Sequence, residues 1–133
     1  MLHMSTPLYE QVIAHCESQY PKEACGILAG TSEMVAQVYP MRNVEESPIG
    51  YSMDPKEQLQ VEKQMRSHSQ HLIGIYHSHT ASDAYPSSVD VGLSLGPEIA
   101  YVLVSLKDRQ RPVLKSYRID GTTVTPEEVV QGS

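Results

Sequence analysis

The 133-residue sequence contains no tryptophan and no phenylalanine, so its large aromatic side chains are all tyrosines. A buried core must therefore be built from Leu, Ile, Val, Met and Tyr side chains. Hydrophobic residues still make up 40% of the chain and charged residues 20%, which is typical of a globular protein. We expect a single domain over 1–133, with a core at about 6–120 and a flexible tail at 125–133.

Other absences exclude whole classes of protein. No apolar run approaches the length of a membrane span, and the N-terminus lacks the pattern of a secretory signal. Two cysteines, Cys16 and Cys25, are too few for a disulfide framework. The net charge of −6 argues against nucleic-acid binding, which needs a basic face. We therefore expect a cytoplasmic protein that binds neither membranes nor nucleic acid. Its oligomeric state stays open, with a homodimer among the options.

The remaining pattern predicts alternating helices and strands. Apolar spacing, capping residues and early prolines predict helices at 6–19, 54–67 and 87–95. Apolar runs bounded by turn residues predict strands at 23–30, 34–41, 71–77, 98–106, 111–119 and 120–124. Residues 43–53 are expected to form a loop. This order predicts an α/β domain built around one mixed sheet.

The segment YHSHTASDAYPSSVD, residues 76–90, concentrates side chains that bind metals. Alternate residues of a strand share a face, so His77 and His79 project together from the end of a predicted strand. Ser87 is placed to cap the next helix, which puts Asp90 in the first turn of that helix. Two histidines, one carboxylate and an open position form the ligand set of a catalytic zinc site.

Hydrolysis at such a site needs a carboxylate base that is near the metal but not bound to it. It also gains from a donor that faces the oxyanion, and Ser87 is placed to be that donor. Spacing alone leaves four candidate bases, which are Glu23, Glu45, Glu46 and Asp83. Glu23 is favoured because it begins an apolar strand, where a buried charge is costly without a purpose.

A purely structural interpretation also exists for each of these features. The sequence SSVD is a capping box, which would explain Ser87 and Asp90 without any metal. Two histidines near a strand end can be ordinary polar loop residues. We favour the metal site because strand phase and helix cap agree within one short segment. Cys25, two residues after Glu23, is interpreted as a small core residue.

Together these motifs resemble the JAMM metalloprotease family. The segment HSHTASDAYPSSVD matches H-x-H, seven residues, S-x-x-D, and YPKEACGILAG resembles the second signature, a Glu ahead of Cys-Gly. The resemblance covers about 6–120 and implies the MPN (JAMM) fold, a curved mixed sheet flanked by helices and layered as in cytidine deaminases. It implies roles for five residues: zinc ligands His77, His79 and Asp90, general acid/base Glu23 and oxyanion stabiliser Ser87.

The short chain resembles the compact prokaryotic branch of that family. The resemblance implies a substrate that is a ubiquitin-like or sulfur-carrier protein ending in Gly-Gly. The reaction would hydrolyse the amide between that glycine and an amine, either cysteine or a lysine side chain. Two alternatives remain, a non-catalytic MPN scaffold module and a zinc hydrolase of a small-molecule amide. Thr80 departs from the family pattern, which often has proline after the second histidine.

Overall fold

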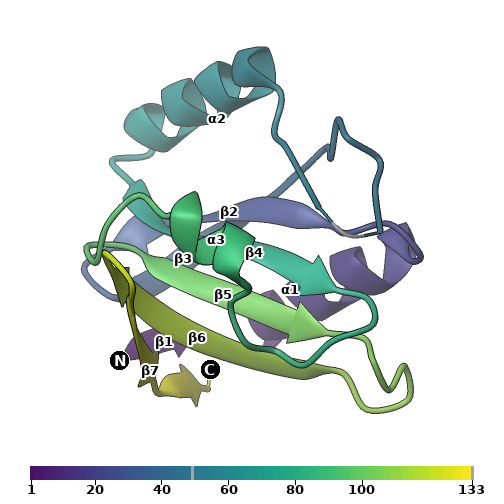
Figure 1. Ribbon diagram of the computed structural model, residues 1–133. Coiled ribbons are helices and arrows are strands. Elements are labelled where there is room, and N and C mark those ends of the chain that lie inside the picture. Colours follow the sequence, from purple (N-terminus) through teal and green to yellow (C-terminus); the bar gives the residue numbers. More distant parts are fainter. Residues whose placement is uncertain (49, 133) are drawn as a thin grey trace.

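The computed structural model describes residues 1–48 and 50–132 (Figure 1). Its helices are α1 (Thr6–Gln19), α2 (Pro55–Ser67) and α3 (Ser88–Gly92). Its strands are β1 (Leu2–Met4), β2 (Cys25–Thr31), β3 (Met34–Met41), β4 (His71–His79), β5 (Ala100–Ser105), β6 (Val113–Asp120), β7 (Thr123–Glu127) and β8 (Val129–Gln131). They form one curved mixed sheet in the order β7-β6-β5-β4-β2-β3-β1-β8.

The sheet lies between two helices (Figure 1). Val12 and Cys16 of α1 pack into the core on one face, and Val61 and Met65 of α2 pack on the other. Each helix therefore buries one apolar stripe against the sheet, as its spacing predicts. Within the described residues, no helix combines the length and apolarity that a membrane crossing demands.

Local sequence signals explain most element boundaries. Helix α1 and strand β3 have their predicted bounds, although Ser5 rather than Thr6 caps α1 by accepting a hydrogen bond from the N–H of Leu8. Asp54 caps α2 as expected. Strand β4 runs two residues beyond its predicted end, and α3 stops at residue 92 rather than 95. The longer β4 matters because it brings the whole histidine pair onto rigid backbone.

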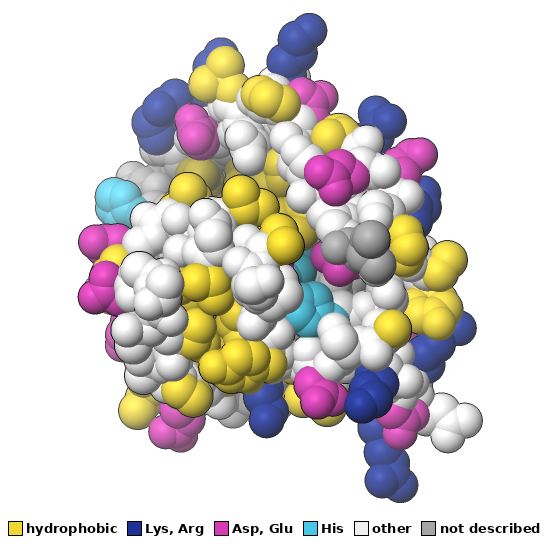
Figure 2. All heavy atoms as spheres, viewed as in Figure 1, with side chains coloured by type: hydrophobic (Ala, Val, Ile, Leu, Met, Phe, Trp, Pro, Cys, Tyr) yellow, Lys and Arg dark blue, Asp and Glu magenta, His cyan; other side chains and the backbone are white. Residues whose placement is uncertain are grey.

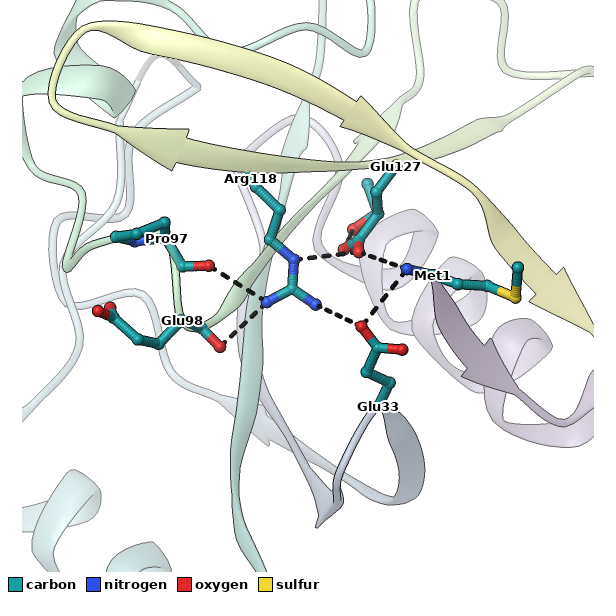
Figure 3. A network of polar contacts seen from close by, with 7 residues as sticks. Met1, Glu33, Pro97, Glu98, Arg118 and Glu127 are labelled. Carbon is teal, nitrogen blue, oxygen red and sulfur yellow. Dashed lines mark hydrogen bonds and ion pairs between the residues drawn. The ribbon is translucent and has the colours of Figure 1, made fainter.

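Within the segment 125–133, which the sequence predicts to be a flexible tail, residues 125–127 form the end of β7 and residues 129–131 form strand β8. The polar sequence of this segment did not indicate its hydrogen-bond and strand partners, which lie elsewhere in the chain. Glu127 accepts a hydrogen bond from the Arg118 guanidinium at 3.0 Å (Figure 3). It also accepts one from the Ser116 hydroxyl at 2.7 Å. Strand β8 pairs in parallel with β1, another strand that the sequence did not predict.

Tyr76 braces the sheet against α1 from behind the histidine pair. It pairs with Gly26 across the β2–β4 ladder and is fully buried, and its hydroxyl lies 2.6 Å from Nδ1 of His15 in α1. A methyl group at Gly26 would overlap the Tyr76 ring. We expect Gly26→Ala to lower the free energy of unfolding by about 1–3 kcal/mol, the usual cost of overpacking a core.

Urea unfolding checks this prediction. Gly92→Ala is the matched control, because a methyl group there meets nothing within 4 Å, and its midpoint should stay close to that of the original protein. Equal midpoints for the two variants would show that the Tyr76 ring can shift to make room for the methyl group without lowering the free energy of unfolding.

Candidate active site

The register between β2 and β4 places Glu23 beside the histidine pair. In this antiparallel ladder Cys25 pairs with His77 and Gly26 with Tyr76. The same register, continued by two residues, sets Glu23 opposite His79. Paired residues of an antiparallel ladder share a face, so Glu23 and both histidines lie on the face that α2 covers. Residues 54 or more positions apart in the chain thus meet because the ladder aligns them.

His77, His79 and Asp90 form a compact group, the metal group, whose ligand atoms all lie within 4.8 Å of one another. The two Nε2 atoms are 3.3 Å apart. Asp90 places Oδ1 3.2 Å from Nε2 of His77 and Oδ2 3.0 Å from Nε2 of His79. Two ligand atoms bound about 2.0–2.1 Å from a tetrahedral zinc ion lie about 3.3 Å apart. The spacing and the donor set therefore fit zinc.

Contacts with neighbouring residues hold each imidazole in place beside Asp90. Nδ1 of His79 donates to the backbone carbonyl of Asp83 at 2.9 Å, which leaves Nε2 with its lone pair for a metal. The ring of His77 stacks on Tyr51, with centroids 4.7 Å apart. Burial lowers the pKa of His77 although Asp90 opposes the shift, so the neutral ring that binds metal is favoured.

The capping box of α3 aims the Asp90 carboxylate. Ser87 Oγ accepts the N–H of Asp90 at 3.1 Å, and Oδ2 of Asp90 accepts the N–H of Ser87 at 2.8 Å. The capping and metal interpretations are thus two parts of one arrangement, since the cap turns the carboxylate towards His79. Burial alone would raise the pKa of Asp90, but hydrogen bonds from both histidines and from Ser87 hold it below its usual range.

Among the four carboxylates that spacing left open as the base, Glu23 is buried and the other three are exposed. Glu23 is only 7% exposed, and burial raises its pKa to about 7. It lines a cleft of about 520 Å³ together with Glu45, Ser87 and two members of the metal group, His79 and Asp90. Glu46 and Asp83 instead have exposed side chains that pair with surface lysines. Glu23 therefore combines burial, a raised pKa and access to the metal group.

Sequence reasoning missed two residues of the 43–53 loop. Asn43, which is buried, donates its amide to the carbonyls of Glu23 at 2.9 Å and Gly50 at 3.0 Å. Its oxygen accepts the N–H groups of Glu45 at 3.1 Å and Ser52 at 3.0 Å. This network holds the loop so that Tyr51 stacks on the ring of His77. A polar residue at a strand end is a weak signal, so nothing local marked either position.

A second, smaller cleft of about 180 Å³, lined by a larger share of hydrophobic residues, adjoins the first one. Its walls include Leu95 and Tyr101, and the two clefts share Tyr51, Asp90 and Leu93. Figure 2 shows histidine side chains in a hollow on this side of the molecule, with hydrophobic side chains gathered beside it. The metal group therefore lies at the junction of the two clefts.

Comparison with known proteins agrees with this geometry. Residues 5–120 match the family of prokaryotic homologs of the JAB domain. The chain is 44% identical over 131 residues to the CysO-cysteine peptidase of Mycobacterium tuberculosis, covering 97% of this chain and 90% of that protein. It is 35% identical over 88 residues to the desampylase of Haloferax volcanii, covering 64% of this chain and 63% of that one.

Two solved structures share the fold. A protein from Desulfitobacterium hafniense superposes with a TM-score of 0.91 at 37% identity, covering 100% of this chain and 94% of that one. A structure of the JAMM metalloprotease-like zinc site in the proteasome and signalosome gives a TM-score of 0.63 at 17% identity, covering 100% and 99%. The second likeness concerns the fold alone.

The metal group fits zinc and lies at a strand end of this sheet. Together with the similarity to known proteins, it defines an enzyme of the JAMM isopeptidase class. The chain belongs to the prokaryotic JAB-domain family, whose model spans most of its length. The MPN (JAMM) fold expected from the sequence is confirmed, as is the expectation of a zinc enzyme rather than a scaffold module.

Proposed function

We propose that the protein hydrolyses the amide or isopeptide bond that follows the C-terminal Gly-Gly of a ubiquitin-like or sulfur-carrier protein. The observation that carries this proposal is the buried Glu23 carboxylate, which shares one cleft with the metal group. The names of the relatives support the substrate class, since one is a CysO-cysteine peptidase and another a desampylase. The amine released is cysteine or a lysine side chain.

His77, His79 and Asp90 would hold the zinc ion, through Nε2 of each imidazole and the carboxylate of Asp90. When bound, zinc supplies a Lewis acid that polarises a carbonyl and makes a water molecule more acidic. The protein contributes the rigidity of this site. Strand β4 fixes both histidines, and the α3 cap fixes the aspartate, so the ligands need little reorganisation.

Glu23 accepts a proton from the attacking water and later gives it to the leaving amine. A raised pKa of about 7 suits a group that must both take and return a proton near neutral pH. Ser87 Oγ accepts the Asp90 N–H, which leaves its hydroxyl hydrogen to donate to the oxyanion. One residue therefore both caps α3 and faces the reacting carbonyl.

The two clefts give the substrate a direction. Glu23 lines the larger cleft and not the smaller one, so the leaving amine, which needs a proton from Glu23, occupies the larger cleft. The tail of the carrier then lies in the smaller cleft, whose lining includes Tyr51 and Tyr101. Because this cleft is small, glycines without side chains suit the positions next to the metal group.

An exposed apolar ridge beside these clefts would receive the body of the carrier. It consists of Val89, Leu93 and Leu95, which are 66%, 68% and 66% exposed. All three also line one or both clefts. A second copy of the enzyme on this ridge would cover the active site, whereas the carrier must lie there for its tail to enter. Large exposed apolar groups next to a site mark a protein interface.

We expect Val89→Ser combined with Leu95→Ser to raise the KM for a carrier conjugate about tenfold more than the KM for a short peptide with the same Gly-Gly bond. A tenfold difference corresponds to about 1.4 kcal/mol of binding. Met34→Ser is the matched control, because Met34 is 61% exposed and lines neither cleft. Equal losses on the conjugate and the peptide would remove the ridge from carrier binding.

The proposed reaction is tested by mass spectrometry. The zinc-loaded protein is incubated with a Gly-Gly carrier joined through its C-terminus to cysteine, and separately with a lysine-linked conjugate. Loss of the cysteine or lysine adduct, with the Gly-Gly terminus intact, is the expected result. Cleavage of small-molecule amides alone would favour a different zinc hydrolase, and no cleavage of either conjugate contradicts the proposal.

We further infer that residues 1–133 act as a single catalytic domain in the cytoplasm. One sheet includes β1, near the start of the chain, and β8, near its end, which supports a single domain. A homodimer stays a prediction.

A further inference from the structure

The backbone around Glu23 is held from outside strand β2, which begins two residues later. The N–H of Glu23 donates to the carbonyl of Ser47 at 2.8 Å, and its carbonyl accepts from Asn43. The N–H of the next residue, Ala24, donates to Oγ of Ser78 at 2.8 Å. The direction of the Glu23 side chain therefore depends on three partners that the strand ladder does not supply.

Ser78 is the partner most closely tied to the metal group, because it lies between His77 and His79 in β4. Its side chain points to the opposite face and is fully buried. Its own N–H donates to the carbonyl of Ala24 at 3.0 Å. The Ala24–Ser78 pair is thus closed on one side by a hydroxyl oxygen, where a regular ladder would use a backbone carbonyl.

We propose that Ser78 is a positioning residue that sets the reach of the Glu23 carboxylate towards the metal group. This inference rests on the role proposed for Glu23. Because Ser78 is flanked by both histidines, its hydroxyl ties the segment that carries the base to the strand that carries the ligands. Base and ligands then share one hydrogen-bonded frame, in which a displacement of about 1 Å can cost about 10²-fold in rate.

Asn43 also holds Glu23, but it is a poorer probe of this geometry. Its four hydrogen bonds organise the loop that carries Tyr51, so its replacement would disturb the stacking on His77 as well. Ser78 contacts the Glu23 segment without contacting that loop in the described hydrogen bonds. Replacing Ser78 therefore separates the position of the base from the position of Tyr51.

The test uses the full zinc-loaded chain and the carrier–cysteine conjugate. We expect Ser78→Ala to lower kcat by about 10- to 100-fold while KM changes by less than about threefold. Bound zinc should stay at the level of the original protein, because both histidines are retained. Hydrogen exchange of the Ala24 amide should become faster. Ser78→Thr keeps the oxygen acceptor and should recover most of kcat.

Ser116→Ala is the matched control. Ser116 is also buried and hydrogen-bonded, but its partner is Glu127 on β7, away from the clefts. The Ser116→Ala variant should lose a similar amount of stability. It should keep kcat within about twofold, since Ser116 takes no part in the reaction in the clefts. If Ser78→Ala does not fold, Ser78→Cys replaces it, because a thiol is a weaker acceptor and predicts an intermediate kcat.

Several results would overturn the inference. One is an unchanged kcat in Ser78→Ala while Glu23→Gln is inactive, which would leave the proposed function standing. Loss of zinc from Ser78→Ala would show that the hydroxyl supports the ligands rather than the base. A Ser78→Thr variant as slow as Ser78→Ala would exclude the oxygen as the cause. No cleavage by the original protein would instead defeat the proposed function, and this inference with it.

Discussion

Glu23→Gln is expected to lose at least about 10²-fold in kcat on the carrier conjugate while it keeps its zinc, because a glutamine cannot take or return a proton. The amide has nearly the shape of the carboxylate, so the backbone contacts of Glu23 with Ser47 and Asn43 should survive. Burial makes the charged form of this residue costly, so the neutral variant should be at least as stable as the original protein.

Steady-state kinetics, zinc content and thermal unfolding together measure this result. Glu45→Gln is the matched control, since Glu45 lines the same larger cleft but is more exposed and was an alternative base by spacing alone. It should keep kcat within about tenfold of the original value. Full activity in Glu23→Gln, or a larger loss in Glu45→Gln, would transfer the role to another carboxylate.

Much of the fold was predictable because its signals are local. Proline at the first helical position and a capping side chain before it mark the start of α2, and alternating or continuous apolar runs mark the central strands. The edge strands β1 and β8 gave no such signal. Each has only three residues, and each is stabilised by pairing with the other, at opposite ends of the chain. Their order is a property of the assembled sheet.

The candidate site divides in the same way. The metal group was readable because its three residues fall within fourteen positions, where strand phase and a helix cap fix their relative directions. Glu23 could not be chosen by spacing, since 54 residues separate its neighbour Ala24 from Ser78 and only the β2–β4 register brings them together. Tyr51 was missed because the loop that carries it is shaped by Asn43 rather than by its own propensity.

Asp90→Ala should lose zinc, which makes it the second large effect. Asp90 supplies the only carboxylate of the described metal group, and its two oxygens lie 3.2 and 3.0 Å from the two imidazole nitrogens. Without it, two histidines remain, which is fewer than the three protein ligands of a catalytic zinc site. We expect zinc affinity to fall by more than the 10- to 100-fold that loss of a residue supporting a ligand costs.

Two further variants isolate the cause. Asp90→Asn keeps an oxygen that can accept the N–H of Ser87, so the α3 cap persists while the ligand charge is lost; it should bind zinc nearly as poorly as Asp90→Ala. Asp83→Asn should bind zinc normally, since Asp83 orients His79 through its backbone carbonyl and its side chain is exposed. Competition with a chromogenic chelator measures all three affinities. If Asp90→Ala retained the affinity of the original protein, the carboxylate would serve only the helix cap, and the chemistry proposed for this cleft would have no metal site to act on.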